Sequence, residues 1–347
     1  MPNLNDPKRQ FLANLFDTAV AAADPRLILK DRLPPPPKGR TVVIGAGKGA
    51  AQLAQAFEAL WPHPYDGVVV TRYGYGAPCQ RIKVLEAAHP VPDQAGIEAA
   101  RALQDALRGL GPEDQVIALI CGGGSSLLPA PPEGLTLEDL QALNSALLAS
   151  GAPISVMNDI RKQFSTVNGG RLAELAYPAQ VVSLVVSDVP GDDPGAVASG
   201  PTVPGRRAAA EVLEEVAARG LELPPRCMAF LQEAAQQPAQ DAPSKTATHV
   251  IASAGLSLTA AAKAAQARGV TAWILSDAIE GEAREVALVH AALARQAQQS
   301  GFPHPAPLVL LSGGETTVTL RHKGRGGRNS EFALSLALAL DGQEGIT

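Results

Sequence analysis

Short apolar runs alternate with amphipathic segments along most of the chain. The runs Gly67 to Thr71, Asp114 to Ile120 and Val181 to Ser187 are apolar almost throughout, without the strict alternation of a half-exposed strand. Helix-like segments separate them, such as the alanine-rich stretch up to Leu60 that follows the β-branched run starting at Thr41. Strands buried on both faces and separated by helices are typical of a parallel sheet with helices on each side. The pattern predicts an α/β fold.

The pattern changes near residue 235. Residues 235–248 are polar and rich in helix breakers, which predicts a linker. Beyond it lie "HVIAS", two further strand–helix units, and two β-rich runs, Leu308 to Leu311 and Thr316 to Leu320, on either side of "SGGE". We predict a hairpin or sharp corner at "SGGE". The expected domains are residues 1–240 and 248–347, with a cleft between them as the default ligand site.

Composition narrows the class of partner. The 347 residues are 46% hydrophobic and 18% charged, so a globular protein is expected. The net charge of −5 argues against nucleic acid or an anionic membrane as the main partner. The three cysteines lack CxxC spacing, which argues against a disulfide framework or thiolate metal site and favours a reduced, cytoplasmic setting. No apolar run is long enough to span a bilayer, and the N-terminal segment does not resemble a signal peptide.

The first glycine-rich loop follows the strand that begins at Thr41. Gly45, Gly47 and Ala50 satisfy the G-x-G-x-x-A dinucleotide fingerprint, and Lys48 lies inside the turn. Arg72 stands where a nicotinamide enzyme should have an acidic residue at the end of the next strand, although an arginine suits the 2′-phosphate of NADP. The alternative is that these glycines only allow the helix to pack closely on the strand.

The second loop and an acidic segment follow two later strands. Gly122, Gly123 and Gly124, with the hydroxyls of Ser125 and Ser126, predict an anion-binding loop; a nucleophilic serine is a further option that needs a histidine base. Asp188 begins a Gly/Pro-rich turn that also holds Asp192 and Asp193. Such carboxylates suit Mg²⁺, although an ordinary capped turn is the alternative, above all for Asp193.

A last glycine-rich turn enters the helix-like segment near the C-terminus. Arg328 in "GRGGRN" suits a phosphate or carboxylate, whereas we interpret Arg321 and Arg325 as solvated. The loops together supply cations, amides, hydroxyls and carboxylates. Phosphoryl transfer needs this combination, and hydride transfer needs fewer anion sites.

Several of these segments resemble one known family. "VVIGAGKGA", "AHPVPD", "CGGGSSLLPAP", "SDVPGDDPGAVASGPTVP", "DAIEGEAREVA" and "LLSGGETTVTL…GRGGRNSEFALSLAL" are similar to the glycerate 2-kinases, which pair a glycerate kinase domain with a MOFRL domain. The resemblance runs from about the first helix to the end of the chain. It implies a Rossmann-like three-layer parallel sheet domain, a second, smaller mixed α/β domain, and ATP- and Mg²⁺-dependent phosphorylation of the 2-hydroxyl of D-glycerate.

The resemblance also implies roles at matching positions. Lys48 would stabilise charge on the transferring phosphoryl group. Arg328 would be its counterpart across the cleft and would contact phosphate or the glycerate carboxylate, while Asp188 and Asp192 would serve the metal or the substrate hydroxyl. Cofactor binding is expected from Gly45, Gly47, Gly122, Gly123, Gly124, Ser125, Ser126 and Glu315. His89 and Glu315 match family motifs without a firm role, and a structural part in the His-Pro turn is equally open for His89.

The chain departs from the family pattern in two places. Gln163 and Asn168 stand where the family usually has His and Lys, while Asn158, Arg161 and Lys162 are kept, so a substrate contact is expected to differ. The chain also stops at "DGQEGIT", before the segment that completes the MOFRL domain in relatives, so an incomplete second domain is expected. The alternatives to a kinase are an NAD(P)H-dependent hydroxypyruvate reductase and a metabolite-binding protein without turnover. A homodimer is left open.

Overall fold

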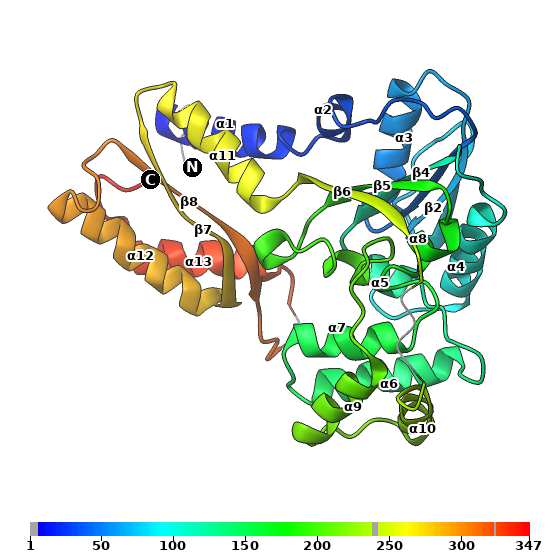
Figure 1. Ribbon diagram of the computed structural model, residues 1–347. Coiled ribbons are helices and arrows are strands. Elements are labelled where there is room, and N and C mark those ends of the chain that lie inside the picture. The colour runs from blue at the N-terminus through cyan, green and yellow to red at the C-terminus, as the bar shows by residue number, and fades with distance from the viewer. Residues whose placement is uncertain (1–5, 238–241, 323) are drawn as a thin grey trace. The chain divides into compact units, whose positions relative to one another are not determined.

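The computed structural model of the chain describes residues 6–237, 242–322 and 324–347 (Figure 1). The chain separates into two units, Pro25–Ile251 and a smaller one made of the residues up to Asp24 together with Ala252–Thr347. The expected division differs, since it placed the N-terminal helix α1 (Pro7–Ala21) in the first domain. Leu15 of α1 instead packs against Ala261 and Ala265 of α11 (Ala254–Gln266) in the smaller unit.

The larger unit is organised around a six-stranded sheet. The strands are β1 (Thr41–Ala46), β2 (Asp66–Arg72), β3 (Ile82–Ala87), β4 (Gln115–Cys121), β5 (Gln180–Val186) and β6 (Lys245–Ala252). Their order is β3-β2-β1-β4-β5-β6, and β1 pairs in parallel with both β2 and β4. The parallel pairs β2–β3 and β4–β5 extend the sheet on either side. This is the strand order of a doubly wound Rossmann fold, in which the chain direction across the sheet reverses between β1 and β4.

Both faces of this sheet are covered. Side chains such as Ile44 and Val68 pack with Leu103 of α4 (Gln94–Leu107) on one face. On the other face Val43 packs with Phe57 of α3 (Ala50–Leu60). Successive strand residues point to opposite faces, so strands buried on both sides read as continuous apolar runs. The predicted three-layer arrangement is confirmed.

Two strands differ from the sequence prediction. β3 was not predicted, because its sequence IKVLEA mixes charged and apolar residues. β6 begins at Lys245, inside the expected linker, and continues the larger sheet beyond β5, although "HVIAS" was expected to open the second domain. Its last residues Ile251 and Ala252 are buried, and burial in a sheet overrode the breaker-rich local sequence. Residues 238–241 of the expected linker lie outside the described residues.

Four helices of the larger unit form a cluster of their own, below the sheet in Figure 1. They are α6 (Leu137–Ala149), α7 (Ile154–Gln163), α9 (Ala209–Ala218) and α10 (Pro225–Ala234). Leu147, Ile160, Val216 and Leu231 meet in a separate apolar core. The remaining helical segments of this unit are α2 (Pro25–Lys30), α5 (Gly124–Leu127), α8 (Arg171–Ala176) and the 3₁₀ turns Pro190–Asp192 and Val197–Ser199.

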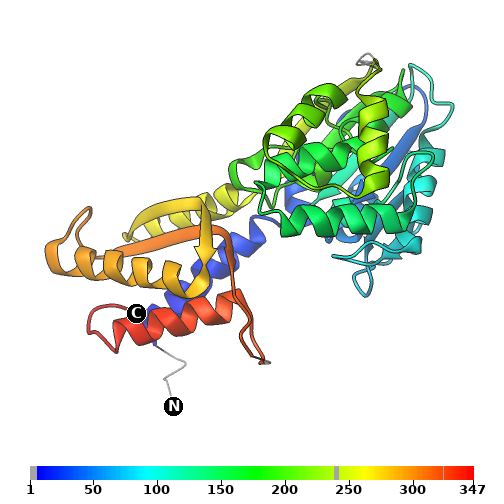
Figure 2. The same ribbon diagram turned by 90° about the horizontal axis from the view of Figure 1, so that it is seen from below.

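The smaller unit has two long parallel strands, β7 (Thr271–Glu282) and β8 (Leu308–Thr317). Helices α1 and α11 lie on one side of this pair, and α12 (Ala283–Ser300) and α13 (Arg328–Leu340) lie on the other (Figures 1 and 2). The second, smaller sheet domain that the sequence predicts is therefore present.

The predicted hairpin at "SGGE" is wrong. β8 runs unbroken through Ser312–Glu315 and stays paired with β7. A β-carbon at Gly314, whose φ is +139°, would lie 2.1 Å from the carbonyl oxygen of Ile279. Gly314 thus permits a close backbone approach next to the register irregularity between Ser276 and Ile279. Glycine in a strand marks either a turn or such an approach, and only the partner strand distinguishes them.

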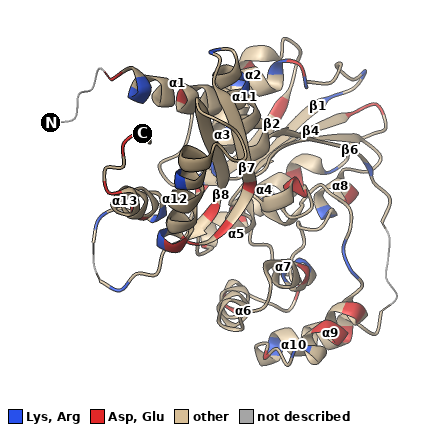
Figure 3. Cartoon of the chain, turned by 90° about the vertical axis from the view of Figure 1, so that its left-hand side faces the viewer, with Lys and Arg blue, Asp and Glu red and all other residues tan. Residues whose placement is uncertain are grey.

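Charged residues of both signs are interspersed along the chain (Figure 3). This distribution agrees with the small net charge of −5. Among the described residues no helix combines the length and the apolar character that crossing a membrane requires.

Candidate active site

The loops that follow β1 and β4 meet at the point where the strand order reverses. The amide of Lys48 donates to the carbonyl of Gly122 (2.9 Å), and the amide of Gly49 donates to Cys121 Sγ (3.2 Å). Ligands of open α/β sheets bind at this switch point, outside the carboxyl ends of the strands. Both predicted glycine loops therefore belong to one region, and they are hydrogen-bonded to each other.

In the first loop the backbone amides already have partners. Besides the amides of Lys48 and Gly49, that of Gly47 donates to Val70 and that of Ala50 to Gly47. A β-carbon at Gly47 would lie 2.2 Å from the carbonyl oxygen of Cys121. The structure therefore supports the packing alternative for Gly47, and for Gly45, where a β-carbon would approach Leu119 in the same way. What the loop exposes is the side chain of Lys48.

The second loop brings charged side chains together. A β-carbon at Gly122 would lie 1.7 Å from Asp188 Oδ2. One at Gly123, whose φ is +82°, would lie 2.8 Å from Lys48 Cε and 3.1 Å from His89 Cε1. Lys48, Asp188 and His89, which are far apart in sequence, thus converge on two neighbouring glycines. We call these five residues the switch-point cluster.

His89 is tied to the serines of the same loop. Its Nδ1 lies 2.6 Å from Ser126 Oγ, which in turn donates to the carbonyl of Gly123 (3.3 Å). Burial, followed by the nearby positive charges of Lys48 and Arg72, holds the pKa of His89 below its ordinary value of 6.5. The imidazole is therefore neutral at pH 7. The sequence left the role of this residue open, and only the fold places it beside Lys48.

The other predicted residues of this region have structural partners. Ser125 Oγ lies 2.8 Å from the buried Ser199 Oγ. Asp193 accepts a hydrogen bond from the amide of Gly195 (2.9 Å), as expected for a capped turn. Cys121, which precedes the second loop, is buried in the apolar core, and burial raises the pKa of its thiol to about 12.

The magnesium site was predicted at the carboxylates that follow β5. In the part of the chain that the structure describes, no three His, Cys, Asp or Glu side chains form a group that could hold a metal. Mg²⁺ in nucleotide sites needs only one or two carboxylates besides phosphates and water. The exposed Asp188 fits that requirement, whereas Asp192 lies in the next turn with a left-handed backbone (φ 54°).

Two predicted residues lie in the smaller unit, where they form an ion pair. Arg328 begins α13, and its Nη1 lies 2.8 Å from Glu315 Oε1 on β8. Both side chains are about half exposed. The structure therefore pairs Arg328 with Glu315, a residue to which the sequence analysis could give no firm role.

A cavity of about 310 Å³ opens beside the second loop, within the larger unit. Its polar lining consists of His89, Ser125, Ser126, Asn144, Arg161, Ser165, Asn168 and Ser199, and α6 and Phe164 supply apolar walls. Sequence analysis selected neither Asn144 nor Ser165. Ser199 lies inside the segment "SDVPGDDPGAVASGPTVP" but was not selected as a site residue.

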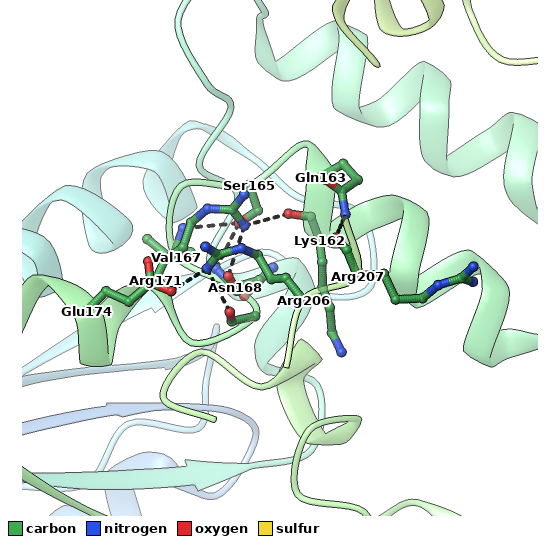
Figure 4. Close-up of polar contacts among 10 residues, drawn as sticks. Lys162, Gln163, Ser165, Val167, Asn168, Arg171, Glu174, Arg206 and Arg207 are labelled. Carbon is green, nitrogen blue, oxygen red and sulfur yellow. Dashed lines mark hydrogen bonds and ion pairs between the residues drawn. The ribbon is translucent and has the colours of Figure 1, made fainter. Parts of the chain in front are cut away.

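The segment 162–171 beside this cavity is held by a polar network (Figure 4). Arg171 donates to the carbonyl of Asn168 (3.1 Å) and to that of Lys162 (2.6 Å). Gln163, one of the two departures from the family pattern, donates to the carbonyl of Arg207 (3.0 Å). The other departure, Asn168, lines the cavity. Gln163 thus supports the segment, and Asn168 contributes to the wall of the cavity.

A doubly wound sheet with a charged cluster at its switch point defines a Rossmann-type ligand-binding protein. Residues 11–232 match the family described as "Domain of unknown function (DUF4147)", and residues 308–347 match the MOFRL family. The D-glycerate 2-kinase of Thermotoga maritima is 36% identical, covering 98% of this chain and 82% of that protein. The chain belongs to the glycerate 2-kinase family.

Two other relatives bear on fold and activity. The crystal structure of glycerate kinase from Thermotoga maritima matches with a TM-score of 0.86 at 34% identity, covering 97% of this chain and 81% of that one. A protein of Agrobacterium vitis is 50% identical, covering 97% of this chain and 78% of its own length, and carries a provisional hydroxypyruvate reductase name. Relatives of this chain thus carry either a kinase or a reductase name, and the geometry of the site has to distinguish these two activities.

Proposed function

We propose that the chain is a glycerate 2-kinase, which transfers the γ-phosphoryl group of ATP to the 2-hydroxyl of D-glycerate. The observation that carries this proposal is the switch-point cluster, where a lysine and a carboxylate converge on the glycines after β4. Phosphoryl transfer is catalysed mainly by positioning and by stabilising charge, and it needs little covalent chemistry from the protein. An exposed cation and a carboxylate at one loop suit that task.

Lys48 is our candidate for stabilising the transferring phosphoryl group. Its backbone is fixed by the bond to Gly122 and by Thr71 Oγ1, which donates to its carbonyl (3.1 Å). Its side chain is exposed, and the part next to the ammonium group passes beside Gly123. A fixed charge aimed at developing negative charge is usually the largest contribution to such catalysis.

Asp188 is our candidate for accepting the proton of the acceptor hydroxyl as the oxygen–phosphorus bond forms and ADP leaves. It follows directly after β5 and lies against Gly122, next to Lys48 in the cluster. In the alternative role, Asp188 and Asp192 would hold Mg²⁺, which would neutralise charge on the phosphates. Arg328 with Glu315 remains our second candidate for anion binding, in the smaller unit.

The reductase alternative finds less support in the first loop. A nicotinamide dinucleotide binds its pyrophosphate through the amides of the G-x-G-x-x-A turn and the start of the following helix. Here the amides of Gly47 and Lys48 donate to Val70 and Gly122 instead. Arg72, the residue that would suit NADP, stacks its guanidinium 3.5 Å above the ring centre of Tyr75.

The test is an assay of purified protein with D-glycerate, ATP and Mg²⁺ in which 2- and 3-phosphoglycerate are resolved. Formation of 2-phosphoglycerate is expected, and 3-phosphoglycerate would contradict the assigned acceptor hydroxyl. The same preparation is given hydroxypyruvate and NADPH, where no oxidation of NADPH is expected. Binding of ATP without any product would favour the metabolite-binding alternative.

A further inference from the structure

We propose that the cavity beside α7 binds the carboxylate end of the acceptor, with Arg161 as its anchor and Asn168 as the group that recognises a hydroxyl. The ligand class is a short 2-hydroxy acid. The inference rests on the proposed function for the reaction that follows binding, and it adds the place where the acceptor binds.

Arg161 lacks a counter-charge. Its Nη1 and Nη2 donate to the side-chain oxygens of Asn158 (3.1 Å) and Asn144 (2.5 Å), both of which are neutral. Its Nε is buried without a partner, and no carboxylate among the described residues pairs with it. A guanidinium withdrawn from water is stabilised by an anion, and a carboxylate matches its planar donors. Burial also lowers the pKa of Arg161, which an incoming carboxylate would offset.

Asn168 supplies the second, independent observation. It is only 6% exposed, and its Oδ1 is buried without a hydrogen-bond partner although the residue lines the cavity. Its backbone is fixed, because its amide donates to Ser165 Oγ (3.1 Å) and Arg171 binds its carbonyl (Figure 4). Buried polar atoms are nearly always hydrogen-bonded, so an unpaired acceptor on a cavity-lining residue calls for a donor, and we assign that donor to the ligand.

The cavity also borders the proposed phosphoryl-transfer residues. Gly123 and His89 line it, and both lie next to the side chain of Lys48. An acid held by Arg161 would therefore present its hydroxyl end toward the switch-point cluster. Leu140 and Leu143 of α6 cover the carbon chain. The volume exceeds the needs of a three-carbon acid, which leaves room for water or for a longer hydroxy acid.

An adenine ring is the competing occupant, and the charge of the site disfavours it. A neutral purine would leave the guanidinium of Arg161 without an anion in a half-buried position. A carboxylate satisfies Arg161, and the adjacent hydroxyl satisfies Asn168. The two occupants predict different kinetic effects.

The experiment compares Arg161→Gln with Arg219→Gln. Both variants remove one positive charge from the larger unit, but Arg219, which directly follows α9, pairs with Glu215 and is not among the lining residues of the cavity. We expect R161Q to raise KM for D-glycerate about 10- to 100-fold while KM for ATP changes less than about threefold. R219Q should change neither. The wild type should strongly prefer glycerate over its uncharged amide, and R161Q should lose that preference.

The inference would be overturned if R161Q left KM for glycerate unchanged, or if it raised KM for ATP instead of KM for glycerate. Either result would leave the kinase proposal intact. If the wild type shows no turnover, the proposed function fails. The carboxylate site is then tested separately, by the thermal shift that D-glycerate alone produces. Stabilisation of the wild type and R219Q but not of R161Q supports the carboxylate site, and no stabilisation of any protein refutes it. Should R161Q not fold, the isosteric Asn168→Asp, which sets a negative charge in the cavity, is expected to weaken glycerate binding at least about tenfold.

Discussion

The two glycine-rich loops at the switch point look alike in sequence and differ in the structure. In the loop after β1 the amides of Gly47, Lys48 and Gly49 are hydrogen-bonded within the protein. In the loop after β4 the glycines instead make room for the charged side chains of Asp188, Lys48 and His89. Glycine enrichment therefore predicts that backbone or side chains approach closely, but it does not say whether the neighbour is the protein or a ligand.

In the first loop one exposed side chain is the candidate for chemistry. Because its amides are occupied, the exposed side chain of Lys48 is the group of this loop that we propose for catalysis. The second loop positions the charged groups, so its glycines should be sensitive to added volume. The following variants test this contrast, beginning with the largest expected effect.

Lys48→Ala should lower kcat about 10²- to 10³-fold, since it removes the positive charge that we assign to the phosphoryl group. The fold should be unaffected because the side chain is exposed and the backbone bonds of residue 48 remain. The matched control is Lys83→Ala, at an exposed position on β3. Turnover and the melting temperature are measured for both. An active K48A protein would mean that the first loop has no catalytic role.

Gly122→Ala should lower kcat by about 10- to 100-fold with little loss of stability. The added methyl group would collide with Asp188 Oδ2. The carboxylate can rotate away, which costs little energy but misplaces the proton acceptor that we propose. The comparison is Gly49→Ala in the first loop, where the nearest atom, Cys121 Sγ, is 3.7 Å from the new β-carbon. Equal effects of the two variants on kcat would remove the distinction between the loops.

His89→Gln should alter how stability depends on pH. The pKa of His89 is held below 6.5 in the folded protein, so below pH 6.5 the unfolded chain binds more protons and the free energy of unfolding falls as pH falls. The variant should show a shallower decrease between pH 7.5 and 5.5 in urea titrations. The difference should stay below the one-proton limit of about 1.4 kcal/mol per pH unit. A steeper decrease in H89Q would contradict the assigned direction.

The sequence pattern predicted those strands and loops whose signal lies in neighbouring residues. The apolar runs identified β2, β4 and β5, and the loops with Lys48 and Asp188 were selected because their residue types suit phosphoryl transfer. The mixed sequence of β3 and the breaker-rich start of β6 hid two strands of the same sheet. At Gly314 the sequence suggested a turn, whereas the close approach of β7 required a glycine inside a strand.

The sequence alone determined that this is an α/β protein with glycine loops after its strands, because periodicity and turn chemistry are properties of neighbouring residues. The tertiary structure decided which loops met, which amides were already occupied, and which side chains lined the cavity. Lys48, His89, Gly122 and Asp188 come from four separate segments, and only the strand order of the sheet brings them together. The unpaired groups of Arg161 and Asn168 are likewise visible only once every neighbouring donor and acceptor has been placed.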